Sequence, residues 1–328
     1  MYGVITYLRN KLFDCGFIEE KSHSVKIISV GNLRVGGTGK TPFVEYLIKR
    51  LSPHFNLAIL SRGYGRKTKG FILLNPHHSA SEVGDEPLLL YKRNPNTLVA
   101  VCEDRNKGVE NILNLLPETN LIILDDAYQH RYINRDINIL LTEYNRPFFK
   151  DKVIPYGRLR EYAQGAKRAD YIVITKCPPL NENQKQKFVS KLKSLSNQKI
   201  FFSNIVYKQP YHIKNKENKI NIKDYSVILF TGIANNSHII EYLNSLTKVI
   251  DTITFSDHHN FTSKDKTQII ERYKTLSQKN TILLTTEKDA MRLQNFETDI
   301  YVLPIDIEVH QYGKNNNLIE NTIQEDVK

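Results

Sequence analysis

Residues 29–42, SVGNLRVGGTGKTP, decide the fold of this chain. An apolar run of the buried-strand type, VKIISVG at 25–31, precedes the loop, and a segment expected to be helical follows at 40–51. A glycine-rich turn that ends in Gly-Lys-Thr between a strand and a helix is typical of a phosphate-binding loop. The sequence therefore predicts an α/β nucleotide-binding fold built around this loop.

The residue types in this loop match the chemistry of a bound ATP. Backbone N–H groups from Gly36 to Gly39 can converge on a phosphate, because glycine tolerates the backbone angles required. The helix N-terminus adds a favourable dipole, Lys40 can reach the β- and γ-phosphates, and the Thr41 hydroxyl can hold Mg²⁺. The first glycine of the usual GxxxxGK[ST] pattern would fall on Arg34, so the loop fits a GGxGKT variant. The predicted ATP-binding residues are Val35, Gly36, Gly37, Thr38, Gly39, Lys40 and Thr41.

A second apolar run, LIILDD at 121–126, places two carboxylates at the end of an expected strand. In P-loop enzymes an aspartate at this place coordinates Mg²⁺, directly or through water. We therefore predict a metal site made by Thr41, Asp125 and Asp126. The sequence leaves open which aspartate ligates the metal.

Short apolar runs alternate with expected helices along most of the chain, which favours a mostly parallel sheet flanked by helices. A polar, Lys- and Asn-rich stretch at 206–224 interrupts this pattern, and a smaller α/β unit follows it. We expect the chain to fray after Tyr312. The expected parts are an amphipathic helix within 1–20, a P-loop domain at 21–215 and a C-terminal α/β domain at 216–328.

Composition excludes several classes of protein. The 328 residues suffice for two domains, and no apolar run approaches the roughly 18–20 residues of a membrane span. Cys15, Cys102 and Cys177 form no CxxC pair, which argues against a disulfide scaffold or zinc ribbon and fits a reducing compartment. The start lacks a signal-peptide pattern, so we expect the bulk of the protein to face the cytoplasm. The net charge of +11 suggests an anionic partner, although most lysines are expected to be solvated.

The first 17 residues have the pattern of an amphipathic helix. Such a helix either docks on the protein core or lies on an anionic bilayer, and the residues leave both open. Its apolar side chains recur at helical spacing: Val4, Ile5, Leu8, Leu12 and Phe13.

Three further strings are hard to explain by packing. SRGYGRK places Arg62 and Arg66 around two glycines, and GDEP places Asp85 and Glu86 ahead of a Leu-rich helix. SDHHNF places Asp257, His258 and His259 after an expected strand. Each also has an ordinary explanation, namely a solvated loop, a helix start or a pair of surface histidines.

Together these strings resemble the tetraacyldisaccharide 4'-kinases, the lipid A 4'-kinases of Gram-negative bacteria. The matching segments run in family order from about residue 12 to 293. They are SVGNLRVGGTGKTP, LSRGYGRK, VGDEPLLL, EDR at 103–105, ILDDAYQHRYINRDINILL, LRE at 159–161, RADYIVITK, FTGIANN, FSDHHNF and LLTTEKDAMRL. Departures from the family pattern are Arg34, where Thr or Ser is usual, and Ala127-Tyr128, where Gly-Phe is usual.

The resemblance implies transfer of the ATP γ-phosphate to the 4'-hydroxyl of tetraacyldisaccharide 1-phosphate, giving lipid IVA in lipid A biosynthesis. It implies a monotopic enzyme on the cytoplasmic side of the inner membrane, with the N-terminal helix at the bilayer and no nucleic-acid partner. Asp85 matches the residue that acts with a histidine on the acceptor hydroxyl, and His258 matches that histidine better than His259. The C-terminal domain is then expected to close a cleft over the site. The implied substrate-binding residues, of which the arginines could hold the 1-phosphate, are Arg62, Arg66, Glu86, Gln129, His130, Arg160 and Glu161.

Two other functions fit a P-loop. A GTPase or targeting ATPase would need a guanine-reading [NT]KxD motif, but Pro178 stands where the aspartate belongs, and a GTP preference would favour this alternative. A nucleic-acid-binding ATPase would suit the charge, but no recognition signature is present, and stimulation of ATP hydrolysis by nucleic acid would be needed to support it. Neither explains the GDEP and FSDHHNF strings.

Overall fold

The computed structural model describes residues 2–192, 198–233, 236–257, 259–293, 296, 298–313 and 318–327. The chain forms two compact units. The first comprises residues Met1–Ile205 and Ile307–Lys328, and the second comprises Val206–Asp306.

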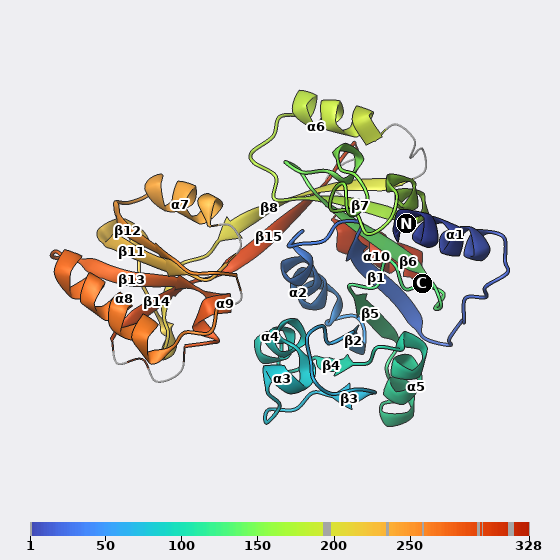
Figure 1. Cartoon of the computed structure of the whole chain (residues 1–328), viewed down its shortest axis with the longest axis horizontal. Helices are drawn as coiled ribbons and strands as arrows, with labels where there is room; N and C mark the ends of the chain where they lie inside the picture. The colour runs from blue at the N-terminus through green and yellow to red at the C-terminus, as the bar shows by residue number, and fades with distance from the viewer. Residues whose placement is uncertain are drawn as a thin grey trace. The chain divides into compact units, whose positions relative to one another are not determined.

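The first unit is built on one large sheet, with β1 at its centre between β5 and β6 (Figure 1). The strands from β8 to β4 run parallel, and β3 pairs antiparallel with β4 at one edge. This confirms the predicted mostly parallel α/β fold. In sheet order the strands are β15 (Ile305–Gln311), β8 (Lys199–Tyr207), β7 (Tyr171–Thr175), β6 (Ile137–Glu143), β1 (Lys26–Asn32), β5 (Leu121–Asp125), β2 (Leu57–Ser61), β4 (Leu98–Val101) and β3 (Ile72–Leu73).

Helices cover both faces of this sheet, which explains why every residue of β2, β5 and β7 is buried. One core lies under α2 (Lys40–Leu51), α4 (Asp85–Arg93) and α10 (Ile319–Val327). α3 (Ala80–Val83) contributes Val83 to this core beside α4. On the opposite face, α5 (Arg105–Leu115) covers the region of β2, β4 and β5. The segment 144–169 and α6 (Glu182–Val189) cover the region of β6, β7 and β8. It includes short 3-10 turns at Phe148–Lys150 and Ala163–Arg168.

The end of the chain corrects the expected domain boundary. Residues 216–328 were expected to form the second domain, but the chain returns at residue 307 and completes the first unit. β15 pairs at the edge of the large sheet, and α10 buries Ile319, Ile323 and Val327 in the core with α2. These three residues stand four apart and so form one helical stripe, which stabilises a tail that was expected to fray.

The second unit is the smaller α/β body that the sequence predicts. β11 (Ser226–Thr231), β12 (Val249–Thr254), β13 (Thr281–Thr286) and β14 (Ile300–Leu303) are parallel, and β9 (Tyr211–His212) and β10 (Asn215–Lys219) extend the sheet antiparallel. α7 (Ser237–Asn244) packs on one face and α8 (Ser263–Leu276) on the other, while α9 (Glu287–Ala290) follows β13 directly.

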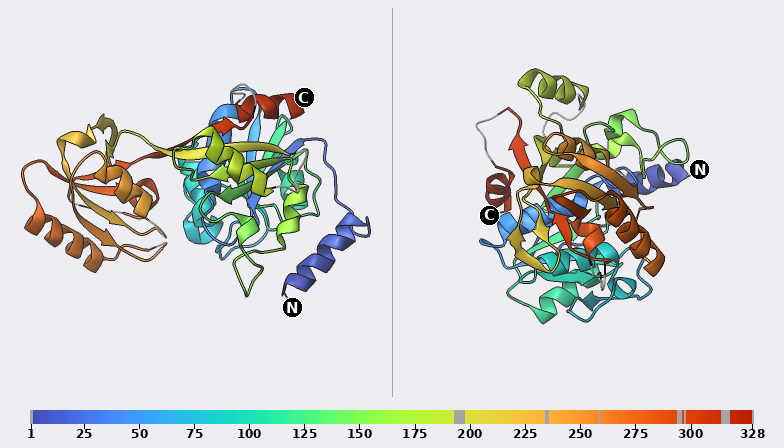
Figure 2. Two further views of the ribbon diagram at one scale, coloured as in Figure 1. Left: turned by 90° about the horizontal axis from the view of Figure 1, so that it is seen from above. Right: turned by 90° about the vertical axis from the view of Figure 1, so that its left-hand side faces the viewer.

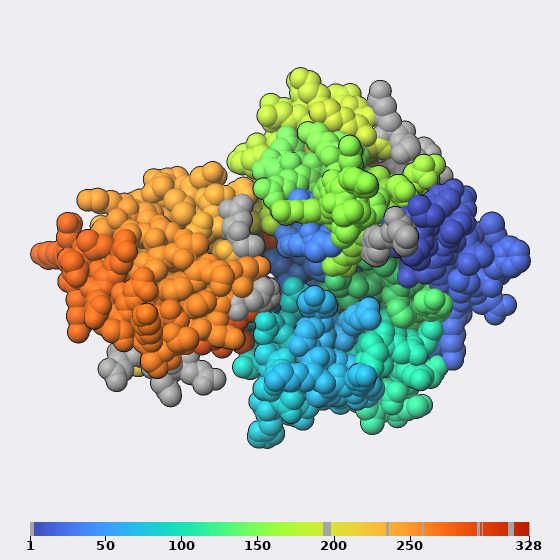
Figure 3. Space-filling view, viewed as in Figure 1, coloured from blue at the N-terminus to red at the C-terminus, as the bar shows by residue number. Residues whose placement is uncertain are grey.

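The N-terminal helix α1 (Tyr2–Asp14) lies on the surface of the first unit (Figures 2 and 3). Phe13 anchors it, because its buried ring packs edge-on against Tyr132 and lies 4.8 Å from the Arg131 guanidinium carbon. The outer face of the helix is exposed and mostly apolar, with Lys11 among its side chains. Its exposed apolar side chains are Val4, Ile5, Tyr7, Leu8 and Leu12.

Candidate active site

The phosphate loop lies between β1 and α2, as predicted. Gly36 and Gly39 have φ angles of 114° and 86°, which side chains other than glycine rarely adopt. Gly39 caps α2, so Lys40 and Thr41 are the first two residues of that helix. The largely buried Lys40 and the half-buried Thr41 therefore stand at a helix N-terminus, where backbone N–H groups and the helix dipole favour a phosphate.

Contacts with β1, with the end of β6 and with the segment after β6 fix the shape of this loop. The Asn32 amide donates to Thr38 Oγ1 at 2.5 Å, and the Val35 N–H donates to the Arg158 carbonyl at 2.8 Å. Arg34, the departure from the family pattern, forms ion pairs with Asp151 at 2.9 Å and Glu143 at 3.2 Å. Its guanidinium therefore anchors the loop to the segment after β6.

Asp125 lies at the end of β5, in register with Val30 of β1, and so stands beside the phosphate loop. Its side chain is 1% exposed, and Ser61 Oγ donates to Oδ2 at 3.4 Å. Oδ1 is buried with no hydrogen-bond partner among the described residues. Burial raises the pKa of Asp125 well above its usual value, and the charges of Glu86 and Asp126 raise it further. A buried carboxylate oxygen without a partner is a fitting ligand for a hard cation.

Asp126 differs from its neighbour. It adopts a left-handed backbone with φ of 49°, and its carboxylate accepts two hydrogen bonds from Arg160 Nη1, at 2.9 and 3.0 Å. Lys40 Nζ lies 3.7 Å from Asp126 Oδ1. The structure thus brings Lys40, Asp126 and the predicted substrate-binding Arg160 together.

Arg105 belongs to the same site, although in the sequence it stands out only as part of the EDR string. It begins α5, is 2% exposed, and its Nη2 donates to the Asp125 carbonyl at 3.4 Å. Burial lowers the pKa of Arg105 to about 10, opposed by Asp125 and Asp126. A buried cation at a helix start is the signal that would have identified Arg105, but the EDR string by itself does not show that the arginine is buried.

Gln129 and Glu161 join α1 to the phosphate loop. The Gln129 amide donates to the Asn32 carbonyl at 2.7 Å and to Glu161 at 3.2 Å. Glu161 is buried and also accepts from Asn10 of α1 and, at 2.8 and 2.9 Å, from Arg168. Its carboxylate is therefore occupied by protein groups.

His130 is half-buried and lies within reach of the charges of Arg105 and Asp104. Burial, with a smaller effect of the Arg105 charge, lowers the pKa of His130 to about 4. Its imidazole is therefore neutral over the range in which kinases are normally assayed.

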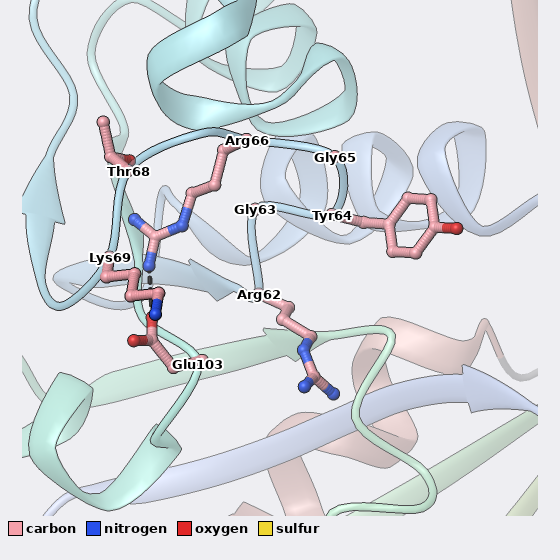
Figure 4. A pocket seen from close by; sticks show the side chains of 8 residues that line it. All are labelled: Arg62, Gly63, Tyr64, Gly65, Arg66, Thr68, Lys69 and Glu103. Atoms are coloured by element: carbon pink, nitrogen blue, oxygen red, sulfur yellow. Dashed lines mark hydrogen bonds and ion pairs between the residues drawn. The ribbon is translucent and has the colours of Figure 1, made fainter.

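The two arginines of SRGYGRK separate. Arg66 bonds Glu103 and the Gly70 carbonyl at one side of an open pocket of about 450 Å³, while Arg62 is exposed and points away from Arg66 (Figure 4). Lys69 lies beside Glu103, and Tyr64 points out of the pocket. The charge of Arg62 helps to lower the pKa of Arg105 and of His130. Arg62 therefore lies on the aspartate side of the site.

Asp85 and Glu86 begin α4, and Asp85 is exposed. Gly84, with φ of 92°, packs so closely on Gly63 and Tyr64 that a Cβ would lie 3.0 Å from the Tyr64 carbonyl oxygen. The GDEP and SRGYGRK strings are therefore packed against each other. Among the charges that raise the pKa of Asp125, that of Glu86 has the largest effect, so its carboxylate belongs to the same cluster.

The predicted base His258 lies outside the described residues. Its neighbour His259 is held in the second unit, where Nε2 lies 3.0 Å from Asp265 and the ring stacks on Phe255 at 4.7 Å. Asp265 also caps α8 through Thr262. His259 thus has a structural role at the start of that helix.

Comparisons with known proteins agree with this geometry. The family model of tetraacyldisaccharide-1-P 4'-kinase matches residues 1–324. The chain is 43% identical to the tetraacyldisaccharide 4'-kinase of Bacteroides fragilis, over 96% of this chain and 88% of that protein. It is also 43% identical to the enzyme of the same name from Flavobacterium psychrophilum, over 93% and 89%.

A crystal structure of LpxK from Aquifex aeolicus in complex with ATP matches the fold with a TM-score of 0.76 and 32% identity, covering 100% of this chain and 96% of that one. The resemblance seen in the sequence is therefore confirmed over the whole chain. With its phosphate loop, its paired aspartates and relatives that it covers over most of their length, the chain belongs to the tetraacyldisaccharide-1-P 4'-kinase family.

Proposed function

We propose that this chain transfers the γ-phosphate of ATP to the 4'-hydroxyl of tetraacyldisaccharide 1-phosphate, forming lipid IVA for lipid A biosynthesis. The observation that carries the proposal is the juxtaposition of Lys40, at the phosphate-loop helix, with the aspartates at the end of β5. Phosphoryl transfer depends mainly on positioning and on charge stabilisation. The loop N–H groups and Lys40 would hold the ATP phosphates, while Arg105 and Arg160 add positive charge beside them.

The residues present fit a magnesium ion. Thr41 and Asp125 supply a hydroxyl and a buried carboxylate with an unpaired oxygen, and Asp126 lies next to them. Among the described residues, no group of three or more His, Cys, Asp or Glu side chains is arranged to hold a metal ion by itself. Mg²⁺ would therefore take its remaining ligands from the ATP phosphates and water. When bound with ATP, Mg²⁺ would neutralise charge on the phosphate oxygens.

We assign activation of the acceptor hydroxyl to Asp85 and His258. An imidazole accepts a proton from a sugar hydroxyl most effectively when a carboxylate orients it and stabilises its charge. The engagement of His259 with Asp265 supports His258 over its neighbour.

The glycolipid is anionic and has long acyl chains, and two features suit it. Arg62 is exposed beside the aspartate site and can pair with a phosphate, whereas Arg66 is committed to Glu103. The exposed apolar face of α1 suits an interfacial helix, and α1 connects to the phosphate loop through Asn10, Glu161 and Gln129. None of the helices in the described ranges has the length and apolarity to cross a bilayer. We propose peripheral binding to the cytoplasmic side of the inner membrane.

The test is a kinase assay in detergent micelles with γ-labelled ATP, Mg²⁺ and tetraacyldisaccharide 1-phosphate. We expect label on the 4' position, lost in Lys40→Met and largely lost in Asp85→Asn and His258→Ala. His310→Ala, which removes an exposed histidine of β15, is the matched control and should retain activity. ATP hydrolysis without transfer, a strong preference for GTP, or stimulation by nucleic acid would contradict the proposal. Full activity in His258→Ala with loss in His259→Ala would reassign the base.

A further inference from the structure

Lys176 follows β7 directly and reaches the phosphate loop. Its ammonium Nζ donates to the Gly37 carbonyl at 2.5 Å and to Glu143 Oε1 at 2.5 Å. The preceding residue acts in the same way, because Thr175 Oγ1 donates to the Thr38 carbonyl at 2.7 Å. The last residue of β7 and the residue after it therefore hold two consecutive carbonyls of the loop.

The backbone at Lys176 supports a specific role. Its φ of 54° is left-handed, a conformation that costs a non-glycine residue free energy and persists where surrounding contacts require it. Among the described residues, the other non-glycine positions with positive φ are Asp126, already placed in the site, and Asn280. The strained ends of β5 and β7 thus flank the phosphate loop.

Holding these carbonyls determines where the loop N–H groups point. In a planar trans peptide the C=O and the following N–H point in opposite directions. Because the Thr38 carbonyl points toward β7, the Gly39 N–H points away from β7. Because the Gly37 carbonyl points toward Lys176, the Thr38 N–H points away from Lys176 and donates to the Gly36 carbonyl at 3.0 Å. The Gly39 N–H is thereby oriented before a phosphate arrives, while the Thr38 N–H stabilises the turn of the loop.

Glu143, at the end of β6, anchors Lys176. Its Oε2 also accepts from Arg34 Nη1 at 3.2 Å, and Arg34 Nε pairs with Asp151 at 2.9 Å. One carboxylate therefore ties down the loop at both Arg34 and Gly37. Burial of these three charged groups is substantial, with side chains 12–26% exposed, so solvent screens the pairs only partly.

We propose that Lys176, anchored by Glu143, is a positioning residue that preorganises the phosphate loop and sets the affinity for the ATP phosphates. This rests on the proposed binding of ATP at that loop. Lys176 acts through the loop backbone and is expected to touch neither the acceptor nor the transferred phosphoryl group.

The test is equilibrium binding of ATP and of adenosine to the purified full chain, with KM and kcat measured alongside. Lys176→Met keeps the aliphatic stem but loses the donors, so we expect the Kd and KM for ATP to rise roughly 10-fold, as for the loss of one charge-assisted hydrogen bond. Adenosine, which has no phosphates, should bind as it does to the wild type. Lys176→Arg should recover much of the ATP affinity.

Lys185→Met is the matched control, because it removes another Lys–Glu pair, with Glu182 on α6 at 2.7 Å. Its ATP affinity should equal that of the wild type. Unchanged ATP affinity in Lys176→Met would overturn the proposal. An equal loss of affinity for ATP and for adenosine, together with a lower melting temperature, would also overturn it, because the effect would then not be specific to the phosphates. If the wild type binds ATP but transfers no phosphate, the proposed function fails while the binding test of Lys176 still stands.

Discussion

Replacing apolar side chains on the outer face of α1 with serine should weaken binding to lipid vesicles. Leu8 is 56% exposed and Ile5 is 60% exposed, while Phe13 holds the opposite side of the helix against the protein. A bilayer surface would cover these exposed side chains without disturbing the fold. The variants Leu8→Ser and Ile5→Ser/Leu8→Ser test whether that contact exists.

The expected loss follows from the exposed fractions. Complete burial of a leucine or isoleucine side chain contributes about 1.5–3 kcal/mol. Because slightly more than half of each side chain is exposed, each has about 1–1.5 kcal/mol available for membrane contact. Leu8→Ser should then lower the partition coefficient roughly 5- to 12-fold, and the double variant roughly 30- to 150-fold.

The assay is co-sedimentation with phosphatidylethanolamine vesicles that contain an anionic phospholipid. Leu115→Ser provides a matched control, because Leu115 is 57% exposed but ends α5, away from the proposed contact. It should bind vesicles as the wild type does. Equal partitioning of the wild type and the α1 double variant, or an equal effect of Leu115→Ser, would refute the assignment of α1 to the membrane.

Three further predictions concern stability and reactivity. The raised pKa of Asp125 means that folding favours its protonated form, so its contribution to stability is present at low pH and is lost as pH rises through the folded pKa. In calorimetry without Mg²⁺ at pH 8, Asp125→Asn should therefore melt several degrees above the wild type, and the difference should be smaller at pH 5. A lower melting temperature of Asp125→Asn at pH 8 would contradict this. Deleting residues 318–328 should lower the melting temperature by about 10 °C or more, because α10 buries three apolar side chains in the main core. An unchanged melting temperature would show that α10 is not needed for stability. Iodoacetamide at pH 8 should alkylate the exposed Cys15 first, because burial raises the pKa of Cys102 and raises that of Cys177 to about 12. Peptide mass mapping measures this order, and labelling of Cys177 as fast as Cys15 would contradict the structure.

The sequence predicts the parts of this molecule that local chemistry determines. Glycines that allow positive φ, followed by Lys40 and Thr41 at a helix start, give a loop whose form needs no distant information. The position of Asp125 also follows from the sequence, because parallel strands align their carboxyl ends and the carboxylate arrives beside the loop.

Distant pairing is what the sequence does not reveal. Arg66 and Arg62 look equivalent in SRGYGRK, yet Glu103 from another strand end occupies Arg66 and leaves Arg62 exposed. Glu161 looks like a site residue, but Asn10 and Arg168 fill its carboxylate. The chain returns to the first unit after residue 306 because α10 packs against α2. The polar sequence of the tail does not indicate this packing.

The two aspartates at the end of β5 have divided roles, and this allows a prediction about the metal. Arg160 and Lys40 surround the Asp126 carboxylate, whereas Asp125 keeps a buried oxygen without a partner in the described structure. A cation that arrives with ATP displaces no ion pair at Asp125 but must compete with a guanidinium at Asp126. We therefore expect Asp125→Asn to raise the Mg²⁺ concentration needed for half-maximal transfer far more than Asp126→Asn, because only the first substitution removes an open ligand.

The measurement is a Mg²⁺ titration of the kinase reaction at saturating ATP. Because burial raises the pKa of Asp125, the wild type should also need more Mg²⁺ as the pH falls, since the metal and the proton compete for that carboxylate. Asp126→Asn should keep this pH dependence and Asp125→Asn should lose it. The opposite result would be a larger Mg²⁺ requirement in Asp126→Asn together with an intact pH dependence in Asp125→Asn. It would assign the metal ligand to Asp126 and show that Arg160 leaves Asp126 when the nucleotide binds.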